Sequence, residues 1–132
     1  MAVGLSAVNL ANAWLNTMRG GGNGTTFTAP ATLFLQCHTA DPGASGTTAV
    51  STGIATRSAM SFAAAASGSM SLTTAVSFSA TGTDTITHVS IWSASSAGTF
   101  YGSAALTASK AVANGDTLSV STFTFSLAPL AA

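Results

Sequence analysis

The side chains that could do acid–base or nucleophilic chemistry are few in this chain and far apart. Its 132 residues include three Asp, no Glu, two His, one Cys and three Lys or Arg. A glycosidase needs two carboxylates held close together, yet Asp41, Asp84 and Asp116 fall in three separate predicted turns. A metal site needs several His, Cys or carboxylate ligands at a suitable spacing, and no such spacing is present. We therefore predict a non-enzymatic protein without a metal or cofactor.

Two pairs of residues could still form part of a nucleophilic site. Cys37 and His38 are adjacent on a predicted strand, so their side chains point to opposite faces and cannot act as nucleophile and base. Asp84 and His88 lie at the start of another predicted strand, with no Gly-x-Ser-x-Gly motif beside them. We expect a structural hydrogen bond between His88 and the carboxylate of Asp84. With a single cysteine no intramolecular disulfide can form, and we expect Cys37 to be a buried thiol.

Two further patterns suggest ligand binding only weakly. The glycine-rich run at Gly20–Gly24 follows a predicted helix and lacks the Lys-Ser/Thr of a phosphate-binding loop. Trp92 and Tyr101 could stack on a sugar ring, but no cluster of Asn, Asp or Glu is available to bind its hydroxyl groups. We expect both rings to pack inside the protein, and a carbohydrate-binding module remains an alternative.

The scarcity of charge is the strongest global feature of the sequence. Only 5% of residues are charged, 47% are hydrophobic, and the formal net charge is zero. Soluble domains average about 25% charged residues, and net charge helps to keep identical monomers apart. We therefore expect a subunit whose surface is largely covered by copies of itself or by other proteins. Three basic residues are too few for a nucleic-acid interface.

Neither a membrane span nor a signal peptide is expected. A spanning helix needs about 20 consecutive, mostly apolar residues, and the longest apolar run here is residues 62–66. The first 15 residues lack a basic start and contain Asn9 and Asn12 in their middle, which is unlike a signal peptide.

The sequence predicts one short helix near the start. Ser6 is a suitable N-cap, Arg19 lies in the last turn, and Gly20–Gly22 end the helix. Apolar residues recur between them at helical spacing, namely Ala7, Leu10, Ala11, Trp14, Leu15 and Met18. Trp14 is the expected anchor, which either docks the helix on the domain's own sheet or inserts into a neighbouring subunit.

After the glycines the apolar residues alternate with period two, which is typical of β-strands. Strands are expected over residues 33–38, 69–80, 88–92, 100–106 and 118–127. Their turn spacing predicts an antiparallel β-sandwich, jelly-roll-like or barrel-like, with one N-terminal α-helix. We expect a single domain over residues 1–132, with helix and Gly-rich hinge at 1–22 and the sandwich at 23–132.

Three local features refine this prediction. Asn114-Gly115-Asp116 predicts a tight hairpin in which both central residues have positive φ. The apolar parity changes between Val120 and Phe123, which predicts a bulge near Ser121–Thr122 or a strand whose two halves bury against different partners. The Gly/Ser/Thr-rich stretch Asp41–Gly53 is expected to be a long loop, either mobile or ordered by a neighbouring subunit.

Several predicted strands carry apolar residues on both faces, as with Phe34 beside Leu33 and Leu35, or Trp92 beside Val89 and Ile91. Two buried faces need two covering layers, which we expect neighbouring subunits to supply. The candidate interface residues are therefore Trp14, Leu15, Met18, Phe34, Trp92, Phe123 and Phe125.

Five motifs together resemble a protein family. They are LANAWLN within residues 9–16, FTAPATL at 27–33, HTADPG at 38–43, ITHVSIW at 86–92 and SKAVANGDTL at 109–118. As a set these motifs resemble small structural proteins of tailed actinobacterial phages, usually labelled minor tail or tail-fibre proteins. The resemblance covers nearly the whole chain. It implies a virion component without enzymatic activity and brings no functional site residues with it.

The expected function is thus a structural role in a phage virion as a homo-oligomer, with a trimer as the first expectation. The expected partners are copies of the chain and other virion proteins, either tail proteins or the major capsid protein. A capsid decoration protein that stabilises the shell is the main alternative. A host glycan is a weaker possible ligand, and no nucleic acid or membrane is expected.

Overall fold

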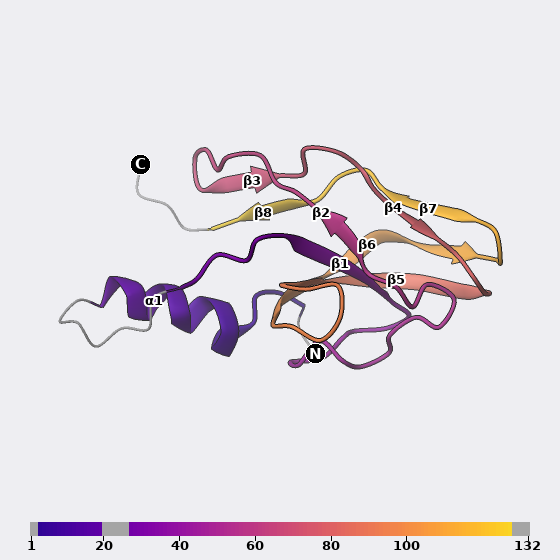
Figure 1. The fold of residues 1–132 in the computed structure, drawn as a ribbon, viewed down its shortest axis with the longest axis horizontal. Helices are drawn as coiled ribbons and strands as arrows, with labels where there is room; N and C mark the ends of the chain where they lie inside the picture. Colours follow the sequence, from indigo (N-terminus) through magenta and orange to yellow (C-terminus); the bar gives the residue numbers. More distant parts are fainter. Residues whose placement is uncertain (1–2, 20–26, 128–132) are drawn as a thin grey trace.

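The computed structural model of the chain describes residues 3–19 and 27–127, which form two β layers with a short helix at one end (Figure 1). One layer is an antiparallel sheet in the order β2 (Ser58–Met60), β1 (Leu33–His38), β5 (Asp84–Trp92), β6 (Phe100–Val112). The other layer contains two antiparallel pairs, β4 (Val76–Ser79) with β7 (Thr117–Val120) and β3 (Ser69–Ser71) with β8 (Thr124–Ser126). The prediction of a mainly β, antiparallel fold with one N-terminal helix is confirmed. The barrel-like variant is wrong, because the described sheets do not close.

The main core lies between the two layers. On β1 and β5 the paired residues Leu35 and Ile91 lie on the face that also carries Cys37 and Val89, and all four are buried. The facing layer contributes alternate residues of β4 and β7, which are Val76, Phe78, Leu118 and Val120. Period-two alternation places these residues on one side of each strand, as the sequence predicts.

The opposite face of β1 and β5 is also buried, but by the chain's own loops. Gln36, His38, Ser90 and Trp92 lie on this face and are buried. Arg57, from the loop that follows β1, stacks over the Trp92 ring at 3.8 Å from its centroid. The expectation that neighbouring subunits cover this face is therefore wrong for Trp92, because a loop of the same chain covers the ring.

The long stretch Asp41–Gly53 is ordered by contacts within the chain. The N–H of Thr39 donates to the carbonyl of Ala49 at 2.9 Å, and the N–H of Gly43 donates to the Asp41 carboxylate at 2.8 Å. Val50 forms an isolated bridge with His38 at the end of β1. These contacts fold the loop back on the sheet. The loop is therefore ordered by its own chain, which differs from both expected states, a mobile loop and a loop ordered by a neighbouring subunit.

The predicted helix is present, and its first turn is wound unusually wide. Residues Ala7–Ala11 form a π-helical turn (η1) that continues into α1 (Asn12–Met18). Ser6 is the N-cap, as predicted, and its Oγ accepts a hydrogen bond from the N–H of Asn9 at 3.2 Å. The predicted glycine stop at Gly20–Gly22 lies outside the described residues.

No helix in the described part of the chain is long and apolar enough to cross a membrane.

The predicted hairpin at Asn114-Gly115 is wrong in its strand pairing. A turn is present, since the N–H of Asp116 donates to the carbonyl of Ala113 at 3.0 Å. However, β6 pairs with β5, whereas β7 pairs with β4 in the other layer. Gly115 has a φ of 91°, and Asn114 is not among the residues with positive φ. The turn therefore carries the chain from one layer to the other and does not join two paired strands.

The apolar parity changes after Val120 because the two halves of the predicted strand pack against different partners, which is the second of the two explanations that the sequence offers. The first half of the predicted strand, Thr117–Val120, pairs with β4, and the second half, Thr124–Ser126, pairs with β3. The predicted strand at residues 69–80 is broken in the same way, into β3 and β4. The N–H of Leu72 donates to the carbonyl of Phe123 at 3.1 Å between the two pairs, so the second layer is one long ribbon with an interruption.

Candidate functional site

The N-terminal segment is fixed to the edge of β6 by backbone hydrogen bonds. The N–H of Ser6 donates to the carbonyl of Tyr101 at 2.7 Å, and the N–H of Ser103 donates to the carbonyl of Gly4 at 2.8 Å. Further along, the Nδ2 of Asn9 donates to the carbonyl of Phe100 at 2.9 Å. Gly102 permits this approach, because a Cβ there would lie only 2.8 Å from the carbonyl oxygen of Gly4. The entry of the chain into the helix is therefore held in one position.

The inner side of the helix docks through Leu10 and Trp14. The indole of Trp14 makes edge-to-face contacts with Phe27 and Phe125, with ring centroids 6.0 and 6.3 Å apart. Edge-to-face contacts of this kind add to the stabilisation from burial. The expectation that Trp14 docks the helix on its own domain is consistent with these contacts, because both aromatic partners belong to the same chain.

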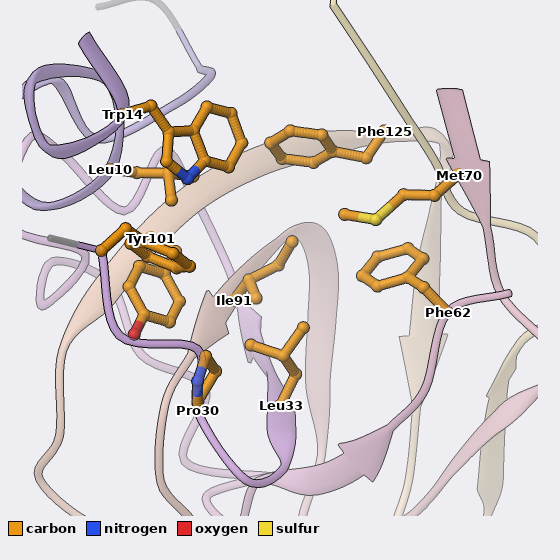
Figure 2. A pocket seen from close by; sticks show the side chains of 10 residues that line it. Leu10, Trp14, Pro30, Leu33, Phe62, Met70, Ile91, Tyr101 and Phe125 are labelled. Atoms are coloured by element: carbon orange, nitrogen blue, oxygen red, sulfur yellow. The ribbon is translucent and has the colours of Figure 1, made fainter. Parts of the chain in front are cut away.

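An apolar pocket of about 140 Å³ lies beneath the helix. Its wall includes Leu10 and Trp14 from the helix, Leu33 from β1 and Phe125 from β8, and Figure 2 shows these side chains turned toward one space. Met70 and Phe62 complete the far side in the same view. Among the described residues of the wall, only the indole of Trp14 and the phenol of Tyr101 carry a polar atom, so this lining suits hydrocarbon groups.

The outer side of the same helix leaves large apolar side chains exposed. Val8, Leu15 and Met18 are 76%, 64% and 82% exposed. Among the described residues, five of the six exposed large hydrophobic side chains lie between positions 3 and 18, the remaining one being Leu127. We name Val8, Ala11, Leu15 and Met18 the outer stripe. The exposed apolar surface is thus concentrated on the N-terminal segment.

The seven predicted interface residues do not form one surface. Trp14 and Phe125 meet at the pocket, whereas Leu15 and Met18 project outward from the helix. Phe123 is half-buried against Phe62, with ring centroids 6.1 Å apart.

The last two of the seven lie on the opposite face of the sheet. Phe34 is half-buried and pairs with Trp92 in the register of β1 and β5. Trp92 is only 5% exposed, so within a single chain its ring is already covered. The carbohydrate-binding alternative loses its main support here, because the rings of Trp92 and Tyr101 are both buried.

A histidine–serine pair that the sequence did not reveal lies inside the protein. The Nε2 of His38 is 2.7 Å from the Oγ of Ser90, and the Nδ1 of His38 is 2.9 Å from the carbonyl oxygen of Thr48. Both side chains are fully buried, so a substrate has no access to the serine oxygen. The pairing depends on the register of β1 and β5, which a sequence pattern alone does not fix.

The predicted hydrogen bond between His88 and Asp84 is wrong. The Nδ1 of His88 is 2.8 Å from the Oγ1 of Thr87. One oxygen of Asp84 instead accepts from the Oγ of Ser51 at 2.8 Å and from the N–H of Gly53 at 3.2 Å. These bonds, with the Ser51 hydroxyl first, lower the pKa of Asp84. Asp84 therefore stabilises the turn that ends the long loop.

The remaining reactive groups are arranged for structure. Cys37 is a buried free thiol, as predicted, and burial raises its pKa to about 12. Across the described ranges, no group of three or more His, Cys, Asp or Glu residues is placed to hold a metal ion.

A two-layer β domain with few charges and an exposed apolar helix side is typical of a structural subunit within a larger assembly. A family model described as "Podophage GP4 fiber I protein gp80" matches residues 5–128. Because the match spans nearly the whole sequence, the chain belongs to this phage fibre family. The expected resemblance to tail-fibre proteins is thereby confirmed. No curated protein matches the chain.

Proposed function

We propose that the protein is a non-enzymatic structural component of a tailed-phage fibre and that it acts as a homo-oligomer within the virion. Membership of a phage fibre family supports the fibre role. The observation that supports the homo-oligomer is the exposure of Leu15 and Met18 on the outer stripe, in a chain with only 5% charged residues. A trimer is the proposed stoichiometry, and an actinobacterial host is proposed from the sequence motifs.

The position in the particle is tested by cryo-electron microscopy of intact virions, combined with quantitative mass spectrometry of the purified particles. We expect density for this chain in fibres attached to the tail, and a copy number set by the symmetry of the tail. Density spread over the capsid surface, with a copy number that follows the shell lattice, would instead support the capsid-decoration alternative and contradict the fibre proposal.

The oligomeric state is tested separately on purified protein by size-exclusion chromatography with light scattering. We expect a mass three times that of the 12.9 kDa chain at micromolar concentration. A monodisperse monomer under those conditions would contradict self-assembly of the isolated protein without bearing on the fibre location.

A further inference from the structure

We propose that the apolar pocket beneath the helix is a binding site for one small aromatic hydrocarbon, of the size of benzene. The class of ligand follows from the volume of the pocket, from its lining and from the arrangement of the rings around it. The site lies within a single chain, so it is a property beyond the fibre role and does not depend on that role.

The pocket has the volume of one aromatic ring. Its free space is about 140 Å³, and an apolar cavity of about 150 Å³ engineered in another protein stays dry and binds benzene. A water molecule needs about two to four polar partners, and no polar atom of the described lining residues is exposed to the pocket. Of these residues only Tyr101 has a hydroxyl, and Figure 2 shows its oxygen pointing away from the shared space. The pocket therefore favours an apolar occupant over water.

The aromatic rings of the wall contact one another edge to face. The contacts join Phe125 to Trp14, Trp14 to Phe27 and Phe27 to Tyr101, with ring centroids 6.3, 6.0 and 5.9 Å apart. Phe62 lies across the space from Trp14 (Figure 2). A further ring placed between them can make offset or edge-to-face contacts of the same kind, which add to the stabilisation from burial. An aromatic ligand is therefore favoured over an aliphatic one of equal volume.

The two sides of the pocket are held in place by separate sets of hydrogen bonds. On the helix side, the N–H of Ser6 donates to the carbonyl of Tyr101 at 2.7 Å. On the far side, β3 pairs with β8, and Met70 is the partner of Phe125 in that register. Because each side is anchored independently, closing the space would break backbone bonds. A ligand instead supplies the contacts that the lining side chains lack.

A free small molecule suits the pocket better than an aromatic side chain of another protein. A phenylalanine of a partner chain would bring its two flanking amides to the pocket, and these need hydrogen-bond partners once water is removed. The described lining residues expose no polar atom that could bond to them. The ligand is therefore a free hydrocarbon ring.

The site is tested first on the wild-type protein by NMR, with benzene as the probe. We expect benzene to shift the methyl signals of Leu10, Leu33 and Ile91, which line the pocket, because its ring current acts on the side chains that it touches. The methyl groups of Val76 and Leu118 belong to the core but not to the pocket wall, and they serve as the internal control. Unchanged signals of the wall residues in benzene-saturated buffer, or equal shifts of the control residues, would overturn the site.

Two related compounds test the class of ligand in the same experiment. Phenol has a hydroxyl that the pocket would bury without a partner, so we expect it to bind about tenfold more weakly than benzene. N-Acetylphenylalanine amide carries the same ring between two amides, and we expect it to leave the signals of Leu33 and Ile91 unchanged. Equal affinity for phenol would contradict the apolar assignment. Equal affinity for the phenylalanine derivative would show that the pocket takes a side chain of a partner protein, and would overturn the free ligand.

A substitution that fills the pocket gives a second test. We expect the melting temperature of the wild type to rise with the benzene concentration, because the ligand binds the folded state. Leu33→Phe enlarges a half-buried residue of the wall and is expected to abolish that rise. The matched control Leu106→Phe makes the same change at a half-buried position outside the wall, and we expect it to keep the response of the wild type.

An equal rise in Leu33→Phe and in the wild type would show that benzene binds elsewhere, and would overturn the pocket as the site. If Leu33→Phe does not fold, the NMR titration of the wild type decides the question alone. Both tests use a single chain in solution, so the fibre location and the oligomeric state stand or fall on their own measurements.

Discussion

The Oγ of Ser90 lies 2.7 Å from the Nε2 of His38, although 52 positions separate the two residues. The Thr48 carbonyl can only accept, so Nδ1 of His38 carries the proton and Nε2 accepts from the Ser90 hydroxyl. The Nε1–H of Trp92 donates to the same Ser90 oxygen at 2.7 Å. This chain of bonds satisfies three buried polar groups and joins β1, β5 and the long loop.

The network predicts that the protein loses stability as the pH falls below about 6.5. Burial lowers the pKa of His38 and outweighs the hydrogen bond to the Thr48 carbonyl, which raises it, and the nearby His88 and Arg57 lower it further. The unfolded chain therefore takes up a proton at a pH where the native imidazole stays neutral, so the stability is complete above the unfolded pKa and declines below it.

Urea unfolding at pH 7.5 and pH 5.0 checks this prediction, with the midpoint expected to be lower at pH 5.0. His38→Gln is the control, because it removes the titrating ring. Its midpoint is expected to change less between the two pH values, and an equal change in both proteins would contradict the role of His38.

A methyl group at position 102 is predicted to displace the N-terminal segment. In Gly102→Ala the new Cβ would lie 2.8 Å from the carbonyl oxygen of Gly4, which is backbone and cannot rotate away. Such overpacking typically costs about 1–3 kcal/mol. Thermal melting measures the loss, and hydrogen exchange is expected to show faster exchange at Ser6 and Ser103. Gly82→Ala, whose Cβ meets its nearest neighbour at 3.4 Å, is expected to melt closer to the wild type.

The turn between the layers predicts that a β-branched substitution destabilises the protein more at Gly115 than at Asn114. Gly115 has a φ of 91°, so Gly115→Val forces a β-branched residue into the left-handed region, at a cost of about 1–2 kcal/mol. Asn114 lacks a positive φ, and Asn114→Val is expected to cost much less. Denaturant melts of both variants provide the comparison. Equal destabilisation would show that the turn has positive φ at both positions, as in the hairpin that the sequence suggested.

Trp14→Ala is predicted to loosen the docking of the helix. The ring is half-buried, so we expect a loss of about 2–3 kcal/mol, less than the 3–5 kcal/mol typical of a fully buried aromatic residue. Trp14→Phe keeps an aromatic ring near Phe27 and Phe125, and it is expected to recover part of the loss. A melt of Trp14→Ala that matches the wild type would show that the helix is held by its backbone bonds alone.

Local features of the fold could be predicted from the sequence, and pairings between distant segments could not. Ser6 was recognisable as an N-cap, and the alternation around Leu35 and Val89 marked two strands, because both signals lie in neighbouring residues. The partners of β7 and β8 were not recognisable, because a tight turn such as Asn114-Gly115 usually joins paired strands.

The candidate site was predictable only in part, for a similar reason. Leu15 and Met18 were identified from their apolar character, and both are exposed as a contact surface requires. Trp92 has the same character, but the loop carrying Arg57 folds over it. The sequence pattern indicates which side chains are apolar and should be buried. It does not indicate whether the same chain or another one buries them.

The split pairing of β7 and β8 has a consequence for how the protein reaches its native state. Both strands are made after β3 and β4, and each must return across more than 35 residues of intervening chain to find its partner. Until residues 117–126 are in place, the edges of β3 and β4 lack their native partners. Because both pairings join segments far apart in the sequence, we expect the second layer to form late in folding.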